Sequence, residues 1–232
     1  MASFDAGYRA LVIGAGGGIG AAFMQRLAAD PGCAGVSGLA RRNGDFDLAD
    51  EDSVRAAADG FAASGTVFEL IVCATGALVI GGRGPEKAIK ALSPAAMAEQ
   101  FAVNAIGPAL VLKHFSPLLA KNRRSVFAAL SARVGSIGDN RLGGWISYRA
   151  SKAALNQIVR TAAIEIARSR PLSVVAALHP GTVATSLSDD FSSGRQRLSP
   201  ADSAGRMLQV LDGLQPDQTG GFYAYDGTPI VW

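Results

Sequence analysis

The sequence predicts an α/β fold, a doubly wound parallel sheet of about seven strands with helices on both faces. Short apolar, β-branched runs alternate with helix-like segments along the chain, which implies parallel pairing through right-handed crossovers. The composition, 49% hydrophobic and 18% charged with 28 glycines, fits a sheet buried on both faces. A length of 232 residues favours a single domain over 1–232.

The first elements surround a glycine-rich turn. Residues 9–13 form a short apolar run that predicts a strand, and residues 18–29, apolar-periodic and ending before Pro31, predict a helix. The next segments continue the alternation, with strands predicted at 35–40 and 67–74 and a helix at 51–63.

In the second half, Ser93-Pro94 is a typical helix start, and the apolar pattern continues to about residue 120. Pro108 lies inside this pattern and predicts one long or kinked helix. The remaining elements are strands at 125–130, 173–178 and 221–225, and helices at 147–169 and 200–212.

Charge and cysteine content exclude several classes of protein. The 22 basic and 19 acidic residues are scattered, whereas a nucleic-acid binder carries a dense basic stripe. Cys33 and Cys73 form no metal-binding or redox pattern and are expected to be reduced packing residues. The N-terminus lacks a secretory signal, and the longest uncharged apolar stretch, 70–82, is too short to span a bilayer. We expect a cytoplasmic protein without membrane or nucleic-acid partners.

The turn Gly14-Ala-Gly-Gly-Gly18-Ile-Gly20 predicts a dinucleotide site. Gly14, Gly18 and Gly20 let the backbone, including Ile19, approach a pyrophosphate, and the helix N-terminus supplies amide donors. A tight strand-to-helix connection with no ligand is the alternative.

Arg41 and Arg42 follow the second predicted strand, at the position where NAD-binding folds carry an acidic residue that binds the ribose 2′-hydroxyl. Since a guanidinium pairs with a 2′-phosphate, the sequence favours NADP(H) over NAD(H), unless both arginines are solvated loop charges. Asp47-Leu48 places a carboxylate for the adenine amino group, although Asp47 is equally a candidate N-cap of the next helix.

In Tyr148-Arg-Ala-Ser-Lys152, the four-residue spacing puts a phenol and an ammonium on one face of a helix turn. Lys152 is then expected to lower the pKa of the Tyr148 hydroxyl, which makes the phenol a usable proton donor or acceptor. A surface stacking pair is the alternative.

With these glycines, Asn104 midway and Tyr148/Lys152 behind, the chain resembles the short-chain dehydrogenase/reductase family, a Rossmann-type fold. It is similar to the compact branch of C-factor-like and sniffer-like carbonyl reductases. Two strings carry that likeness, Gly143-Gly144-Trp-Ile-Ser-Tyr-Arg-Ala-Ser-Lys-Ala-Ala-Leu-Asn156 and Tyr225-Asp226-Gly227.

The resemblance implies a role for each matching residue. Tyr148 would exchange the proton with the substrate, and Lys152 would hold the nicotinamide ribose hydroxyls. The backbone carbonyl of Asn104 would hold a water of the proton relay, the alternative being a mid-helix polar residue that bonds locally. Further cofactor contacts are implied at Ala74, Thr75, Gly76, Pro180, Gly181, Val183 and Thr185.

Three departures from the family pattern stand out. Ile13 replaces the threonine before the first glycine, and Cys73-Ala-Thr75-Gly76 replaces Asn-Asn-Ala-Gly. The catalytic serine position is Ala132, one residue after Ser131. Because a one-residue shift at a strand end turns the side chain to the other face, Ser131 is the first candidate and Ser136 the second.

The predicted function is NADP(H)-dependent hydride transfer between nicotinamide and a small-molecule carbonyl or secondary alcohol. A catalytically weak or inactive NADP(H)-binding sensor or scaffold is the main alternative, and an epimerase or dehydratase remains open. His114 and His179 are expected to be structural. Residues 185–198 are predicted to form a substrate lid, and the resemblance implies a homo-dimer or homo-tetramer built on the helices of Asn104 and Tyr148.

Overall fold

A computed structural model describes residues 1–41, 46–185 and 197–232. In these ranges six strands form one parallel sheet in the order β2-β1-β3-β4-β5-β6. Their bounds are β1 Tyr8–Ile13, β2 Cys33–Leu39, β3 Leu70–Cys73, β4 Ser125–Leu130, β5 Ser173–His179 and β6 Phe222–Ala224. The doubly wound α/β fold is confirmed. About seven strands were predicted, and the described residues form six because each of the six apolar runs supplies one strand.

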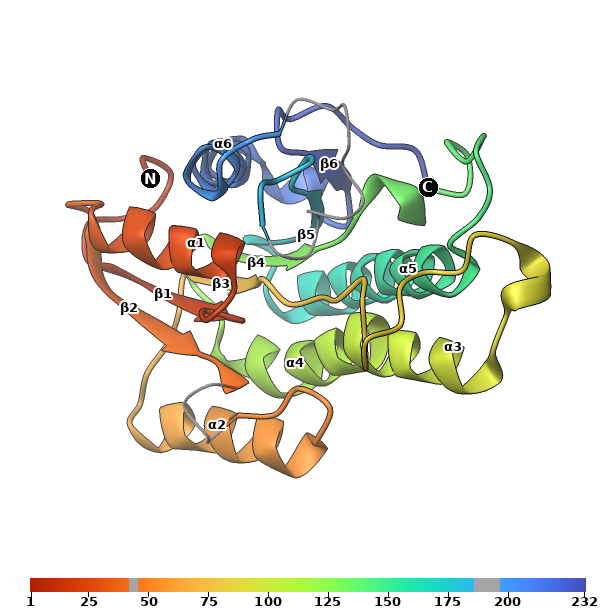
Figure 1. The fold of residues 1–232 in the computed structure, drawn as a ribbon. Coiled ribbons are helices and arrows are strands. Elements are labelled where there is room, and N and C mark those ends of the chain that lie inside the picture. Colours follow the sequence, from red (N-terminus) through yellow and green to blue (C-terminus); the bar gives the residue numbers. More distant parts are fainter. Residues whose placement is uncertain (42–45, 186–196) are drawn as a thin grey trace.

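Helices cover both faces of the sheet. Figure 1 shows α1 and α6 along its upper side and α2 and α4 along its lower side. The helices are α1 Gly18–Ala28, α2 Glu51–Ala63, α3 Pro94–Phe101, α4 Gly107–Phe115, α5 Ile146–Ser169 and α6 Pro200–Gly213. Short 3-10 turns occur at Ile89–Ala91, Ser116–Leu118, Arg133–Gly135 and Pro216–Gln218.

The strands divide the core into two layers because successive side chains point to opposite faces. From β1, Ala10 and Val12 pack with the cluster that includes Phe23 of α1 and Met207 of α6. Leu11 and Ile13 pack instead with residues of α2, α4 and α5, namely Val54, Val111 and Leu155. Ile13 is fully buried there, so the position of the family threonine is part of the core.

Side-chain caps fix where the helices begin. Asp50 caps α2 through a hydrogen bond from Asp52 N, and Ser93 caps α3 through Ala96 N. The alternative role of Asp47 as the N-cap of α2 is therefore wrong. Asp47 Oδ1 accepts instead from Ala49 N (2.9 Å), a local turn before the helix.

The long helix predicted after Ser93 is kinked. A π-helical turn, Ala102–Ile106, joins α3 to α4, with Asn104 at its centre. Pro108 is the second residue of α4 and has no N–H to donate to the Asn104 carbonyl four residues earlier. The widened turn accommodates this missing bond, and such turns are frequent at functional sites.

One helical run, Pro94–Leu118, is long and apolar enough to cross a membrane by length and composition. This is weak evidence for a membrane span, since core helices of soluble proteins pass the same test. The run supplies Val111, Leu112 and Phe115 to the core beneath the sheet.

Candidate active site

The carboxyl ends of β1, β2 and β3 meet at the glycine-rich turn. The carbonyl of Leu39, at the end of β2, accepts hydrogen bonds from Gly14 N (2.8 Å) and Ala15 N (3.1 Å). Ala74 N, just beyond β3, donates to Ile13 O at 2.7 Å. The turn therefore lies at the edge of the sheet where doubly wound folds bind ligands.

Three glycines of this turn, Gly14, Gly18 and Gly20, leave little room for a side chain. A Cβ on Gly20 would lie 2.1 Å from Gly14 O, and one on Gly18 would lie 2.9 Å from Thr185 Cγ2. Gly14 has φ +90°, and a Cβ there would lie 2.8 Å from Ala74 O. The backbone is thus packed closely enough to form a cradle whose surface is main chain.

The start of α1 suits an anionic group. Its N-cap is Gly17, which has no side chain to satisfy the first amides, and its first turn holds no acidic residue. Unpaired amides and the positive end of the helix dipole both favour a phosphate. The residues present therefore fit the pyrophosphate of a dinucleotide.

Arg41 is exposed and stands two residues beyond Leu39, whose carbonyl contacts the turn. Arg42 lies outside the described residues. Leu48 packs against α4, where a Cβ on Gly107 would lie 2.5 Å from Leu48 Cγ. The end of β2 therefore borders the cradle, whereas the segment before α2 packs on α4, and the adenine contact at Asp47-Leu48 stays a prediction.

Lys152 and Asn104 come together beside the segment that follows β3. A Cβ on Gly76 would lie 3.0 Å from Lys152 Nζ and 3.2 Å from Asn104 Oδ1. Asn104 Oδ1 accepts from Ala77 N (2.9 Å), and Asn104 Nδ2 donates to Ala77 O (2.8 Å) and Gln100 Oε1 (2.6 Å). The buried Asn104 side chain thus holds the loop after β3 against the π turn rather than bonding only within its helix.

Tyr148 and Lys152 lie one turn apart at the start of α5, as predicted. Burial raises the pKa of Tyr148, so the expected lowering of this pKa by Lys152 is not found. The Lys152 ammonium donates to Leu130 O at 2.9 Å, and burial lowers its own pKa to about 8. The reason is that both groups are withdrawn from water, where burial disfavours each charged form.

Ser131 follows β4, and its hydroxyl donates to Asn156 Oδ1 of α5 at 2.6 Å. Asn156 Nδ2 is buried without a hydrogen-bond partner among the described residues. Ser136, the second candidate, is also buried and accepts from Asp139 N at 3.1 Å. The serine hydroxyls are therefore engaged within the protein, and Ser131 and Ala132 both line the cavity between these elements.

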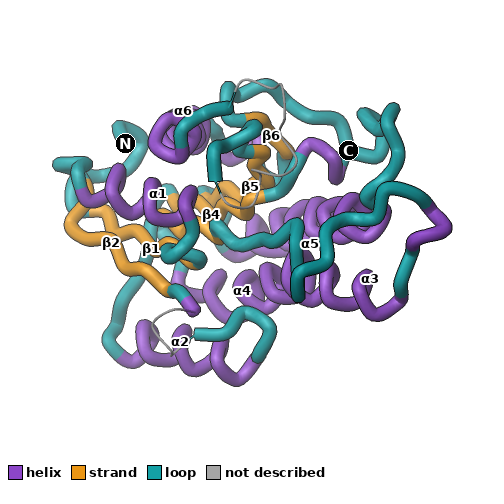
Figure 2. The backbone as a smooth tube through the Cα atoms, in the orientation of Figure 1, coloured by secondary structure: helices purple, strands orange, loops and turns teal. Residues whose placement is uncertain are grey.

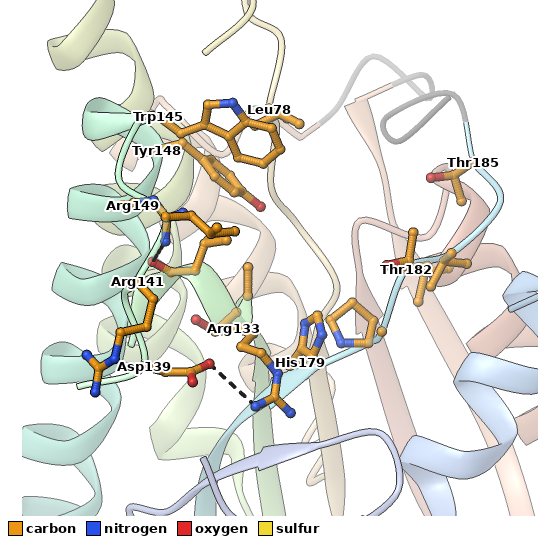
Figure 3. Close-up of a pocket in the computed structure, with 18 residues that line it drawn as sticks. Leu78, Arg133, Asp139, Arg141, Trp145, Tyr148, Arg149, His179, Thr182 and Thr185 are labelled. Atoms are coloured by element: carbon orange, nitrogen blue, oxygen red, sulfur yellow. Dashed lines mark hydrogen bonds and ion pairs between the residues drawn. The ribbon is translucent and has the colours of Figure 1, made fainter. Parts of the chain in front are cut away.

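A cavity of about 380 Å³ connects these elements. Figure 3 shows Trp145 and Leu78 beside the Tyr148 ring on one wall and Thr182 and Thr185 on the opposite one. Its lining spans the glycine turn, the end of β4, α5 and the segment after β5, and includes Ile19, Ser131, Trp145, Tyr148, His179 and Thr185. One space therefore joins the proposed proton donor to the proposed cofactor cradle.

The segment after β5 is anchored at both ends. Pro180 O accepts from Ser203 Oγ at 2.7 Å, and Gly181 adopts φ +82°. Val183 pairs with Leu198 in an isolated bridge. Of the predicted lid, 185–198, residues 186–196 lie outside the described residues.

The sequence analysis did not single out Glu86 or Arg149, which hold the start of α5. The Glu86 carboxylate accepts from Ser147 N and Ser147 Oγ at the start of α5, a contact across 61 positions that no local pattern signals. Arg149 donates to the carbonyls of Gly143, Gly144 and Val134, and its place beside Tyr148 was the available signal. His179 lines the cavity, and burial together with the nearby Arg133 lowers its pKa to about 4.

The long loop between β3 and α3 passes the N-terminal end of α5 before it enters α3 (Figure 2). Trp145 N donates to Glu86 O, which places this loop directly against the start of α5. A distant segment of the chain thus forms part of the wall of the candidate active site.

Comparisons with known proteins identify relatives. Residues 16–224 match the family model described as enoyl-(acyl carrier protein) reductase. The C-signal protein of Myxococcus xanthus is 39% identical over 137 residues, 59% of this chain and 78% of that protein. The 1-hydroxy-2-glutathionyl-2-methyl-3-butene dehydrogenase of Rhodococcus sp. is 36% identical over 133 residues, and the match spans 57% of each chain.

Solved structures share the fold over nearly the whole chain. An NADPH-bound carbonyl reductase from chicken fatty liver superposes with a TM-score of 0.84 at 25% identity, covering 99% of this chain and 96% of that one. The carbonyl reductase Sniffer of D. melanogaster gives 0.82 at 22% identity, covering 97% and 100%. Together with the family model, these matches confirm the resemblance drawn from the sequence, and the chain belongs to the short-chain dehydrogenase/reductase family.

Proposed function

We propose that this oxidoreductase is NADP(H)-dependent and transfers hydride between the nicotinamide and a small-molecule carbonyl or secondary alcohol. The observation that supports this proposal most is that one cavity joins Ile19 of the glycine turn, Tyr148 of α5 and the 180–185 segment. A bound nicotinamide supplies the hydride, and the protein supplies position and the proton.

In this proposal Tyr148 is the proton donor for carbonyl reduction. Its raised pKa keeps the phenol protonated near neutral pH, so the hydroxyl is ready to donate to the oxygen that gains negative charge. Lys152, with a pKa lowered to about 8, carries a charge for much of the time at neutral pH. That ammonium would donate hydrogen bonds to the nicotinamide ribose hydroxyls.

Asn104 and Ser131 act in this proposal by position rather than by direct contact with substrate. Asn104 fixes the loop after β3 next to Lys152. Its main-chain carbonyl, which Pro108 cannot bond, is our candidate acceptor for a relay water. Ser131 supports α5 through Asn156, so the substrate carbonyl receives its hydrogen bond mainly from Tyr148.

The cofactor assignment rests on the cradle and on Arg41. The chicken liver enzyme is described with NADPH bound, and this chain follows its fold over almost its full length. Exposed Arg41, next to the glycine turn, provides a cation for a 2′-phosphate. We expect Arg41→Ala to weaken NADPH binding roughly tenfold while NADH binding stays constant, measured by calorimetric titration of both. Equal losses for both cofactors would contradict this role.

The decisive experiment is an NADPH and NADH titration followed by a panel of aldehydes, ketones and one enoyl thioester. The enoyl thioester belongs in the panel because the matching family model carries that description. We expect NADPH oxidation with carbonyl substrates, and a loss of about 10²–10⁴ in kcat for Tyr148→Phe with NADPH affinity retained. NADPH binding without turnover of any substrate would support the sensor or scaffold alternative.

We also propose that the chain assembles as a homo-dimer or homo-tetramer. Ile106 of the π turn and Ile164 of α5 are about half exposed, on the two helices expected to form the interface. Light scattering on the purified protein tests this, and a monomer at micromolar concentration would contradict it. Localisation in the cytoplasm remains a prediction.

A further inference from the structure

Three consecutive residues before α5 adopt left-handed backbone conformations. Gly143 has φ +63°, Gly144 has φ +66° and Trp145 has φ +53°. Among the described residues, Trp145 is the one non-glycine residue with a positive φ. Glycine tolerates this region freely, whereas a bulky side chain is strained there, so surrounding contacts must hold the tryptophan in place.

Those contacts come from both sides of the turn. Trp145 N donates to Glu86 O, and the Glu86 carboxylate accepts from Ser147 N and Oγ in the next turn. On the other side, Arg149 Nε donates to Gly144 O (2.9 Å) and Nη2 to Gly143 O (3.1 Å). The strained conformation is therefore fixed by a carboxylate and a guanidinium that the proposed chemistry does not use.

The result of this arrangement is the position of the indole. The Trp145 ring lies 6.3 Å from the Tyr148 ring, centre to centre, at 69° to it, and lines the cavity. Figure 3 shows the indole next to Leu78 on the Tyr148 side of the cavity. A substrate whose carbonyl oxygen reaches Tyr148 can place the group attached to its carbonyl carbon against this ring.

We propose that Trp145 is a specificity-determining residue that selects carbonyl substrates with a flat aromatic or conjugated group next to the C=O. The inference rests on the proposed function, because it assumes that Tyr148 marks where the carbonyl binds. Aromatic rings pair with other flat π-systems in offset or edge-on arrangements, a gain that a saturated ring of equal size does not obtain. A strained backbone beside the proposed proton donor is the pattern expected of a functional constraint.

The test compares benzaldehyde with cyclohexanecarbaldehyde, which share a six-carbon ring but differ in flatness. Trp145→Gly removes the indole and relieves the strain at φ +53°, and Trp145→Phe keeps an aromatic ring as the matched control. We expect the ratio of kcat/KM values, aromatic over saturated, to fall about fivefold in Trp145→Gly and less than about twofold in Trp145→Phe. A ratio unchanged in Trp145→Gly overturns the proposal, since a merely structural role would lower both rates together.

A binding measurement separates this proposal from the proposed function. The chain has two tryptophans, so Trp232→Phe leaves Trp145 as the sole indole fluorophore. With saturating NADP⁺, we expect benzaldehyde to quench this fluorescence saturably and cyclohexanecarbaldehyde not to. Saturable quenching, together with no NADPH oxidation when NADPH and benzaldehyde are mixed with the protein, would refute the proposed function and keep the inference. Non-saturable quenching, equal to that of free N-acetyltryptophanamide, overturns the inference, even if Trp145→Gly fails to fold.

Discussion

The candidate active site has two halves, and different kinds of contact fix the shape of each. The glycine half, formed by the ends of β1, β2 and β3, is lined by main chain, and a Cβ on Gly14 or Gly20 would overlap backbone atoms. The substrate half, formed by β4 and the start of α5, depends on side chains. Arg149 donates to the loop before α5, and Glu86 accepts from Ser147 at the start of that helix. One half is defined by steric exclusion and the other by hydrogen bonds between distant residues.

This difference has a consequence for substitution. Where the backbone itself forms the surface, a single added methyl group overlaps main-chain atoms, so it should both distort the turn and lower the free energy of unfolding. Where side chains hold the surface, one lost donor weakens a position but leaves the frame. We therefore expect large, all-or-none effects in the glycine half and graded effects in the substrate half.

The largest effect is expected for Gly20→Ala. Alanine normally stabilises a helix relative to glycine by about 1 kcal/mol, but here its Cβ would lie 2.1 Å from Gly14 O. We expect a loss of more than about 2 kcal/mol in the free energy of unfolding and at least about tenfold weaker NADPH binding. Urea denaturation and NADPH titration measure both.

Gly35→Ala is the matched control, because a Cβ at Gly35 meets nothing within 4 Å. Its effect on unfolding should be neutral or slightly stabilising, by less than about 1 kcal/mol. If the two alanine variants behave alike, the turn is less tightly packed than described, and the contrast between the halves fails.

The next effect concerns Lys152, which joins the two halves. Its pKa is about 10.5 when unfolded and falls to about 8 in the fold because burial disfavours the ammonium. Below pH 8 the fold must hold that charge, so stability rises as pH increases from about 8 to 10.5. We expect up to about 3 kcal/mol over this window, reduced above pH 10 by the raised pKa of Tyr148.

Urea unfolding at pH 7.5 to 9.5 tests this rise, with Lys152→Met as the reference that lacks the titrating group. Other groups titrate similarly in both proteins, so the difference between the two pH profiles isolates Lys152. Parallel profiles would show that the ammonium is better solvated than its burial implies.

The same contrast explains what the sequence revealed. The alternation of elements, the glycine turn and the Tyr148/Lys152 pair are local patterns, and each lies in the type of element that was predicted. The state of the phenol was not, because the burial that raises the Tyr148 pKa depends on the whole fold. Nor did any local signal tie Glu86 to Ser147, since that contact spans 61 positions. The glycine half depends on contacts between neighbouring residues and can be predicted from local sequence, whereas the substrate half depends on contacts between residues far apart in the chain.

The smallest effects, and the sharpest test of the substrate half, come from Ser131 and Ala132. Ser131→Ala leaves Asn156 Oδ1 without its donor, which should cost about 1–3 kcal/mol of stability but change kcat little. Ala132→Ser adds a hydroxyl at the family's serine position and should raise kcat with a ketone up to about tenfold, because one aimed donor stabilises the developing oxyanion.

Steady-state kinetics and urea unfolding of both variants read out the two effects separately. If Ser131→Ala lowers kcat a hundredfold at unchanged stability, the hydroxyl turns from Asn156 to the substrate during the reaction. The substrate half would then show an all-or-none effect like the glycine half, because loss of one oxygen atom would abolish most of the activity. If only Ala132→Ser changes kcat, the native protein polarises the substrate carbonyl chiefly through Tyr148. The Ser131 hydroxyl is then not needed for catalysis, and a hydroxyl at position 132 adds a second donor.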